Sequence, residues 1–492
     1  MDIPSSSLPQ DGLFDAGLIE RVEALDDGRV DANGGVRKRF KDFEPDAVML
    51  VPPSLEEWLP EGHLARFIAE LVENELDLTF FYKSYAKAKG QPPYDPRLML
   101  RVLLYGYCTG VRSSRAIERA CTDMVSFRWL SAQQAPDFRS IARFRDRHLA
   151  AFANIFLQAL ELCQAAGMVK LGKVALDGTK VRANASKHKA MSYARLTEKQ
   201  KVLAQEISDL MEEVKTVDAN EDAKFGPGKR GDELPVELAK RQGRAKALAA
   251  ARASLEEEAR ERARTEAKEK ATKRGDDDDD ITAAGNKAAE TAVPKPTAQR
   301  NFTDPDARIM KRADGSFSYN YNGQAVVDGY RQVIVAAELN QASNDYGQLV
   351  PMVDQTFQNL GQMPAQWLAD TGYCSKANLD HARALEAEHG TEFFISTGRM
   401  KHSAPIPESP RGRIPANTTV VGRMGRKLKT KAGKKAYARR KAIVEPVFGQ
   451  IHTRQGKHLL LRGLEKAQQE WKLLAACHNL MKLRSYRAQP AA

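Results

Sequence analysis

The sequence has 492 residues, the length of about three average domains, and a chain of this size can bury a sizeable core. A peptide or a single small binding module is therefore excluded. The chain holds 76 lysines and arginines against 64 aspartates and glutamates, a net charge of +12, and 42% of its residues are hydrophobic and 28% charged. These proportions are ordinary for globular proteins and exclude both bulk disorder and a membrane protein.

Two patterns indicate the compartment. The opening residues include acids and no apolar core of signal-peptide length, and no run of about 18 apolar residues occurs. The five cysteines are scattered without a CxxC pair, which argues against a disulfide framework and against a cysteine zinc site. They are Cys108, Cys121, Cys163, Cys374 and Cys477. We therefore expect a soluble protein of a reducing cytoplasm.

The N-terminal third divides into a tail and a helical domain. Residues 1–45 are polar and without periodicity, which predicts a flexible tail. In residues 46–168 apolar side chains recur at helical spacing, which predicts an all-helical domain. Asp95, followed by a proline, and Ser113 and Asp137 are the expected helix caps.

The stretch FRSIARFRDRH, after Asp137, is typical of a helix that reads DNA. Ile141 and Phe144 are expected to face inward. The arginines of the same stretch are expected to face outward and contact DNA; they are Arg139, Arg143, Arg145 and Arg147. The alternative is an ordinary arginine-rich surface helix.

A sheet begins next and is interrupted. Residues 169–185 contain the strand-like KVALDGTKV, and residues 186–299 form a charged insertion. Leucines at heptad spacing on both sides of a Gly-Pro-Gly turn at 226–228 predict an antiparallel helical hairpin. The five consecutive acids at 276–280 repel one another, which predicts a solvated linker rather than a metal cradle.

Strands and helices then alternate from residue 300 to 485. FSYNYNGQAVVD and RQVIVAAELN, which meet at Asp328, predict a hairpin. A helix capped between Ser343 and Asp345, the strand QWLAD, a helix capped by Ser375 and the strand EFFIST follow. The order predicts an α/β (α+β) protein, with a mixed sheet flanked by helices, and residues 486–492 form a short tail.

Positive charge is concentrated near the C-terminal quarter. Residues 399–441 hold 14 lysines and arginines and one acid, Glu408, together with several prolines and glycines. This composition predicts a loop that contacts a polyanion. A solvated flexible linker is the alternative.

Three carboxylates are placed as a metal site requires. Asp177 ends the apolar part of the first strand, Asp370 ends a later strand, and Glu445 lies in a basic helix. Acids at the ends of adjacent strands converge, and a helix packed on that edge can supply a third. Such a set can hold two Mg²⁺ ions that activate an attacking oxygen and stabilise a leaving one at a phosphodiester.

Each acid also has a simpler interpretation. Asp177 could belong to a turn with Gly178, Asp370 could only cap the next helix, and Glu445 could pair with Lys441 one helical turn back. Pro446 is expected to kink or restart the helix of Glu445. Competing acids rank lower, with Asp328 explained by its hairpin and Asp304 and Asp306 by a loop; the others are Asp314 and Asp354.

The segments VALDGTKVRANAS, WLADTGY and RRKAIVEPVFGQIH, in this order, resemble the catalytic motifs of bacterial insertion-sequence transposases of the DDE family. The earlier segments VPPSLEEWLPEGHLARFI, DPRLMLRVLLYGY and SIARFRDRH resemble the InsH-type N-terminal domain of such transposases. The resemblance covers about residues 46–485.

This resemblance implies a ribonuclease H-like core, metal-dependent cleavage of DNA at the ends of the element and strand transfer into target DNA. Asp177 and Asp370 would share one metal ion, and Glu445 would complete the second. Related transposases often place a Tyr, an Arg and a Lys around the Glu. Tyr437 and Arg440 match this pattern loosely, since Arg440 is one residue too far from Glu445 and His452 stands at the lysine position.

We therefore expect a transposase with two Mg²⁺ ions, replaceable by Mn²⁺, that pairs terminal inverted repeats in a synaptic homodimer in the bacterial cytoplasm, on the nucleoid. The alternatives are a catalytically silent DNA-binding protein and a ribonuclease H-like nuclease without strand transfer. The residues expected to bind DNA are Arg139, Arg143, Arg147, Arg426, Lys427, Lys429, Arg439, Arg440, Lys441, His452 and Arg454.

Overall fold

The computed structural model describes most of the chain after residue 53. The described ranges are 54–85, 93–225, 236–274, 278–312, 314–398, 409–415 and 417–489. The expected tail at 1–45 and the expected turn at 226–228 lie outside the described residues, as does the end of the expected tail at 486–492. Contacts divide the chain into two units, 1–54 and 55–492, and every helix and strand lies in the second.

The N-terminal region of the second unit is helical, as expected. Its elements are η1 Leu55–Trp58, α2 Leu64–Glu70, the π-helix η2 Leu71–Glu75, α3 Thr79–Lys83, α4 Pro96–Thr109, α5 Ser114–Asp123, α6 Val125–Leu130, α7 Phe138–Arg147 and α8 Leu149–Ala165. Side chains of Asp95, Ser113 and Asp137 accept backbone N–H groups at the starts of α4, α5 and α7. The three caps predicted from the sequence are confirmed.

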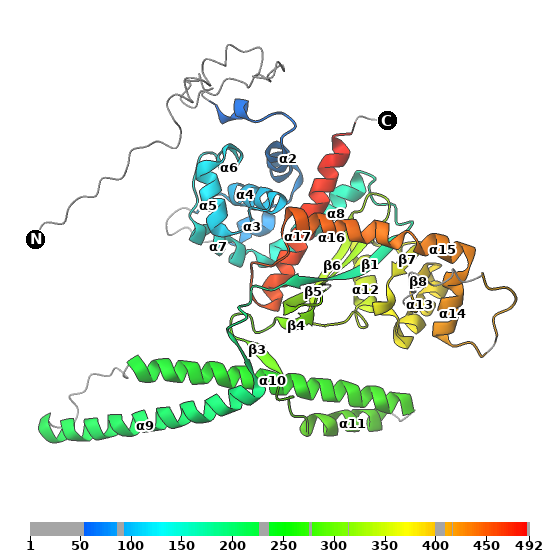
Figure 1. Ribbon diagram of the computed structural model, residues 1–492. Coiled ribbons are helices and arrows are strands. Elements are labelled where there is room, and N and C mark those ends of the chain that lie inside the picture. Colours follow the sequence, from blue (N-terminus) through cyan, green and yellow to red (C-terminus); the bar gives the residue numbers. More distant parts are fainter. Residues whose placement is uncertain are drawn as a thin grey trace, which may run out of the picture. The chain divides into compact units, whose positions relative to one another are not determined.

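A mixed sheet follows (Figure 1). Its strands are β1 Val174–Arg182, β4 Arg308–Lys311, β5 Phe317–Asp328, β6 Ile334–Asn340, β7 Gln366–Ala369 and β8 Glu392–Ile395. The order is β4-β5-β1-β7-β8, and β6 pairs with β5. β5 is antiparallel to β1, β4 and β6, whereas β1, β7 and β8 are mutually parallel. This is the expected ribonuclease H-like sheet.

Helices flank the sheet at α12 Leu349–Leu360, η3 Thr371–Tyr373, α13 Lys376–His389, α14 Val420–Lys429, α15 Lys431–Tyr437, α16 Arg440–Arg454 and α17 Leu464–Arg487. The helix expected to be capped between Ser343 and Asp345 begins later, after Gln348. Ser375 caps α13 as expected. α16 runs without a break through Pro446, so the expected restart there is wrong.

The basic segment is less loop-like than its composition predicts. Much of its described part forms α14 and α15, which are capped by Thr419 and Thr430. Each threonine side chain accepts the backbone N–H of the residue three positions later. Met424 and Ala436 are buried. The prediction of a loop throughout is therefore wrong, because two threonine caps and two apolar contacts suffice to form helices here.

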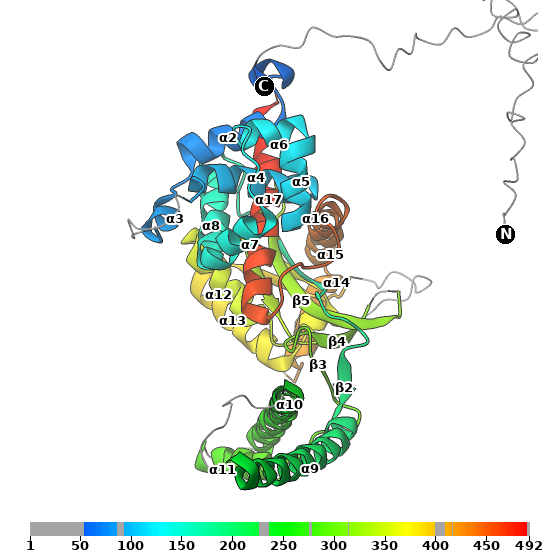
Figure 2. The same cartoon turned by 90° about the vertical axis from the view of Figure 1, so that its left-hand side faces the viewer.

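The insertion contains three helices, α9 Tyr193–Phe225, α10 Val236–Arg274 and α11 Asp278–Glu290, on a stem of two antiparallel strands, β2 Ala190–Ser192 and β3 Gln299–Asn301. α9 and α11 both pack against α10 (Figure 2). A small apolar cluster around Leu196, Leu203 and Leu255 joins α9 to α10. The acidic run was expected to be a linker, but from Asp278 onward it starts α11, where acids complement the helix dipole.

The last helix ties the two halves of the fold together. α17 packs on α8 and α4 of the N-terminal helices and on β6 of the sheet. Trp471 and Leu480 on α17 are almost fully buried, and the Trp471 indole N–H donates to the Gln324 carbonyl of β5. All five cysteines are free, and none of the described helices is long and apolar enough to cross a membrane.

Candidate functional site

Strand pairing brings Asp177 and Asp370 together. β1 and β7 are parallel, and Leu176 of β1 lies opposite Ala369 of β7. Asp177 is the next residue of β1, and Asp370 directly follows β7, so the two carboxylates leave neighbouring strands at the same level. Burial raises the pKa of Asp177 to about 6, with the nearby Asp370 charge acting in the same direction. The two carboxylates are therefore partly buried and repel each other when both are charged.

Arg440 links this pair to the third acid. It is the first residue of α16, its side chain is 9% exposed, and its guanidinium donates to Asp177 Oδ2 at 2.8 Å. The same guanidinium lies 4.0 Å from Glu445 Oε1. Glu445 is 54% exposed, and among the described residues this guanidinium, not Lys441, lies within ion-pair distance of it. We call Asp177, Asp370, Glu445 and Arg440 the acid site.

The acid site offers oxygen donors suited to a hard divalent cation such as Mg²⁺. Two of its carboxylates are adjacent, and Arg440 supplies the positive charge that partly offsets the raised pKa of Asp177. Within the described ranges, however, no group of three or more His, Cys, Asp or Glu side chains could hold a metal ion. The donor set thus fits a divalent ion at the aspartate pair, while Glu445 is joined to it through a guanidinium.

A polar network that the sequence analysis missed supports the two aspartates. Asn322 and Gln324, buried on β5, both donate to Asp345 Oδ1 at 2.7 Å, and the buried Tyr373 hydroxyl donates to Gln324 Oε1. The available signal was the alternation of amides in an otherwise apolar strand. Asp345 had been expected only as part of a helix cap.

Two glycines are required by this network. A Cβ on Gly178 would lie 2.5 Å from Gln324 Nε2 and 2.7 Å from Asp345 Oδ1, and a Cβ on Gly372 would lie 3.2 Å from Asp345 Oδ2. Gly178 follows Asp177 inside β1, so this dipeptide is not a turn. Asp370 does act as a cap, since its Oδ1 accepts the Gly372 N–H at 2.7 Å, and it does so beside Asp177.

Other acids have structural roles. Asp328 is buried in its hairpin and accepts the backbone N–H groups of Leu171 and Tyr330. Asp304 accepts the Tyr321 hydroxyl, and Asp306 accepts the Leu464 N–H at the start of α17. Their lower rank as catalytic candidates agrees with these contacts.

Comparison with protein families finds two matches. A model described as a transposase domain (DUF772) matches residues 53–147, and one described as a transposase DDE domain matches residues 413–484. The first range holds α2 to α7, and the second holds α16 with Glu445 and Arg440, whereas Asp177 and Asp370 lie outside both. Together the two matches support a DDE transposase of an insertion element. No curated protein and no solved structure matches it.

Helix α7, for which the sequence predicts DNA contact, presents most of its arginines to solvent as expected. Arg139, Arg143 and Arg147 are exposed. Arg145, also expected to face outward, is buried, and that expectation is wrong. Residues four apart share a face of a helix, so Arg145 lies on the same inner face of α7 as the buried Ile141.

The C-terminal basic residues of the transposase fall into two groups. Arg426 donates to the carbonyls of Arg411 and Gly412, and Lys427 Nζ lies 2.6 Å from Glu386 Oε1, so both have contacts within the protein. The exposed residues are Lys429, Arg439, Lys441 and Arg454. Arg440 lies within the acid site.

Two further residues of the expected pattern lie near α16. His452 is half-buried, and burial lowers its pKa. Burial raises the pKa of Tyr437, while the neighbouring Arg440 charge lowers it. Tyr437 therefore lies close to the acid site, at the end of α15.

Proposed function

We propose that this transposase cuts DNA at the ends of its element and joins the freed 3′ ends to target DNA, with Asp177, Asp370 and Glu445 as the catalytic acids. The observation that carries the proposal is the register of β1 and β7, which sets two acids from distant parts of the chain at one level. Arg440 then connects the first of them to Glu445. The order of the three motifs supports the same assignment.

The ions in this proposal are two Mg²⁺, for which Mn²⁺ can substitute. Asp177 and Asp370 would hold the first ion and Glu445 the second. When bound, the ions supply activation of the attacking oxygen and stabilisation of the leaving oxygen. The chain itself keeps Asp177 oriented through Arg440 and through its own Oδ1, which accepts the Gly178 N–H.

DNA is the proposed partner, as the terminal inverted repeats and the target. The exposed arginines of α7 would hold the ends, and the exposed basic residues around α16 would hold phosphates beside the acid site. His452, Arg426 and Lys427 remain candidates for the same contacts. Pairing two ends requires two transposases, so we propose a synaptic homodimer acting in the bacterial cytoplasm, on the nucleoid.

The experiment compares Asp177→Asn with Asp354→Asn, an exposed acid on α12 that serves as the matched control. Asp177→Asn should bind end DNA almost as well as the wild type and lose cleavage by about a hundredfold or more, whereas the control keeps both. Mg²⁺-dependent nicking retained by Asp177→Asn would refute the assignment. Cleavage without joined products in the wild type would favour a nuclease, and binding without any cleavage a silent DNA-binding protein.

A further inference from the structure

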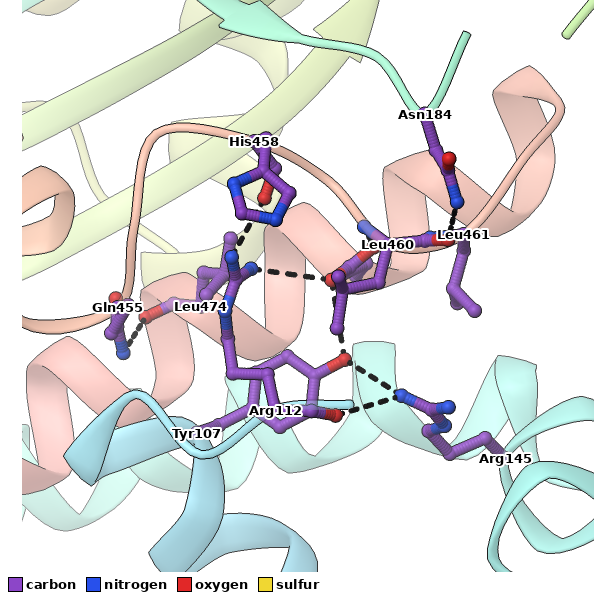
Figure 3. Close-up of polar contacts among 10 residues, drawn as sticks. Tyr107, Arg112, Arg145, Asn184, Gln455, His458, Leu460, Leu461 and Leu474 are labelled. Carbon is purple, nitrogen blue, oxygen red and sulfur yellow. Dashed lines mark hydrogen bonds and ion pairs between the residues drawn. The ribbon is translucent and has the colours of Figure 1, made fainter. Parts of the chain in front are cut away.

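A buried charged cluster lies away from the acid site, between the N-terminal helices and α17 (Figure 3). At its centre the Glu470 side chain is 0% exposed. Its Oε2 accepts the N–H groups of Leu460 and Leu461, both at 2.8 Å. Its Oε1 lies 3.2 Å from the Tyr107 hydroxyl and 3.4 Å from an Arg112 nitrogen.

A second guanidinium completes the cluster. Arg145 of α7 donates to the Arg112 carbonyl at 3.1 Å, to the Tyr107 hydroxyl at 3.5 Å and to the Ser114 hydroxyl. We call Tyr107, Arg112, Arg145 and Glu470 the buried joint. Arg112 pairs with the Glu470 carboxylate directly, and Arg145 is linked to it through the Tyr107 hydroxyl. Burying such charges is costly compared with an apolar core of the same volume. Stability alone is therefore a weak reason for this arrangement.

The buried joint binds the backbone of segment 455–463, which follows α16. Arg112 donates to the His458 carbonyl at 2.8 Å. The approach is close, because a Cβ on Gly456 would lie 2.9 Å from an Arg112 nitrogen, and a Cβ on Gly110 would lie 2.6 Å from the Arg454 carbonyl oxygen. Both glycines have positive φ, at +94° and +86°.

Two elements that carry catalytic acids end at this same segment. α16, which holds Glu445, ends at Arg454. β1, which holds Asp177, ends at Arg182, whose N–H donates to the Lys457 carbonyl at 3.2 Å and whose carbonyl accepts the Leu459 N–H at 2.8 Å. Segment 455–463 thus joins the far ends of both elements to the buried joint.

Helix α7 lies on the other side of the buried joint from segment 455–463. Arg145 lies on α7 between the exposed Arg143 and Arg147, so the same short helix faces solvent with some arginines and enters the buried joint with another. Any DNA held on the outer face of α7 is therefore connected to β1 and α16 through a few buried, hydrogen-bonded side chains.

We propose that Arg145, Arg112 and Glu470 are positioning residues that fix the spacing between DNA held on α7 and the acid site, and so select which phosphodiester is cut. This inference rests on the proposed function. It assigns these residues no contact with DNA or metal. A shift of about 1 Å in the placement of a reacting group can cost about a hundredfold in rate, so small changes in the buried joint have measurable effects.

The first test maps cleavage products to single nucleotides on end-containing DNA for Glu470→Gln and Arg145→Met. Glu470→Gln keeps an oxygen that can accept the Leu460 and Leu461 N–H groups while removing the charge. Both variants should bind end DNA as tightly as the wild type, cut the wild-type position about tenfold more slowly and spread cuts over neighbouring phosphodiesters. A folded variant that cuts only the wild-type position would overturn the proposal.

Two controls separate the positioning role from DNA binding and from general stability. Arg143→Ala, on the outer face of α7, should weaken binding without moving the cut. Lys466→Ala removes the exposed ion pair between α17 and Asp146 and should leave both the binding and the cut position unchanged. A displaced cut in either control would contradict a role specific to the buried joint.

A second measurement uses the wild-type transposase and altered DNA, so it does not depend on the folding of a variant. One base pair is inserted between the sequence protected by α7 and the cut. If the protein fixes the spacing, the cut keeps its distance from the protected sequence and falls on a new phosphodiester. A cut that stays with the terminal bases would overturn the proposal, whereas a wild type that cuts neither DNA in Mg²⁺ would refute the proposed function.

Discussion

Arg440 contacts two of the three proposed catalytic acids. It was expected to contact DNA, and it lies instead 9% exposed between Asp177 and Glu445. Without such a positive group, a half-buried carboxylate next to another would be protonated more readily, because both burial and Asp370 raise the pKa of Asp177. The guanidinium therefore keeps this acid charged and docks the first turn of α16 on β1.

The approach of Asp177 and Asp370 could be predicted from the sequence because each follows a short apolar run that forms a strand. Glu445 was selected for the basic residues around it, and the catalytic roles of all three stay predictions. The residues that support the acids could not be predicted. Asp345 meets Asn322 and Gln324 only because β5 folds back beside β1, and the sequence separation of such partners carries no local signal. The burial of Arg145 was missed for a similar reason, since its partners Tyr107, Arg112 and Ser114 lie 31 to 38 residues earlier in the chain.

Substitution of Gly178 tests the close packing behind Asp177. In Gly178→Ala, the new Cβ would lie 2.5 Å from Gln324 Nε2 and 2.7 Å from Asp345 Oδ1, both on hydrogen-bonded side chains. We expect a loss of about 1–3 kcal/mol in the free energy of unfolding, as for other overpacked sites. Denaturant titration measures it. Gly347→Ala, with nothing within 4 Å of its Cβ, is the control, and equal stability of the two variants would contradict the packing described.

Among the helices and strands, the sequence predicted helix starts correctly where a capping residue is followed by apolar residues at helical spacing, as at Asp95, Ser113 and Asp137. The succession of β5, β6, β7, α13 and β8 along the chain was predictable for the same reason, whereas their order in the sheet was not predicted. High charge density led to predictions of a loop and a linker where helices form, because the capping residues were overlooked. Thr419 and Thr430 start α14 and α15 inside the basic segment, and the acidic run at Asp278 starts α11.

The paired strands β2 and β3 at the base of the insertion bring its two ends together, so the insertion can be removed. Ser192 and Gln299 are paired across β2 and β3, so a short Gly-Ser link can replace residues 193–298. The insertion also has its own apolar cluster, separate from the main core. We expect the shortened protein to fold, with a melting temperature reduced by only a few degrees through the loss of the Glu258 contacts to Arg300 and Arg308.

Circular dichroism and thermal melting measure this outcome. A matched control replaces Glu258 by Gln in the full chain, which removes the same two ion pairs and leaves α9 to α11 in place. Loss of the cooperative transition in the shortened protein, with the control still folded, would show that the sheet depends on the insertion.

At the scale of the whole molecule, α17 and the N-terminal helices bury two histidines. Burial lowers the pKa of His148 to about 4 and that of His478 to about 4. His148 contacts Phe81 and Phe144, and the His478 Nε2 lies 3.0 Å from the Gln332 carbonyl oxygen. Folding therefore holds both rings neutral at a pH where an unfolded chain would begin to protonate them.

The stability of the fold should consequently fall in mild acid. The unfolded chain takes up a proton on each ring below about pH 6.5 and the folded chain only near pH 4, so each histidine lowers the free energy of unfolding by about 2 kcal/mol between pH 7.5 and pH 5. Urea titrations of the wild type and His148→Gln at both pH values measure the effect. We expect the variant to lose less stability than the wild type over this interval, and an equal loss would contradict a neutral, buried His148.

The proposed function requires the three acids to meet around divalent ions. The direct measurement is anomalous scattering from a crystal of the transposase with end DNA and Mn²⁺. We predict a peak bridging the carboxylates of Asp177 and Asp370 and a second beside Glu445, with the Arg440 guanidinium still next to the site. Mn²⁺ bound elsewhere on the protein, with these carboxylates free of metal beside the DNA, would contradict it.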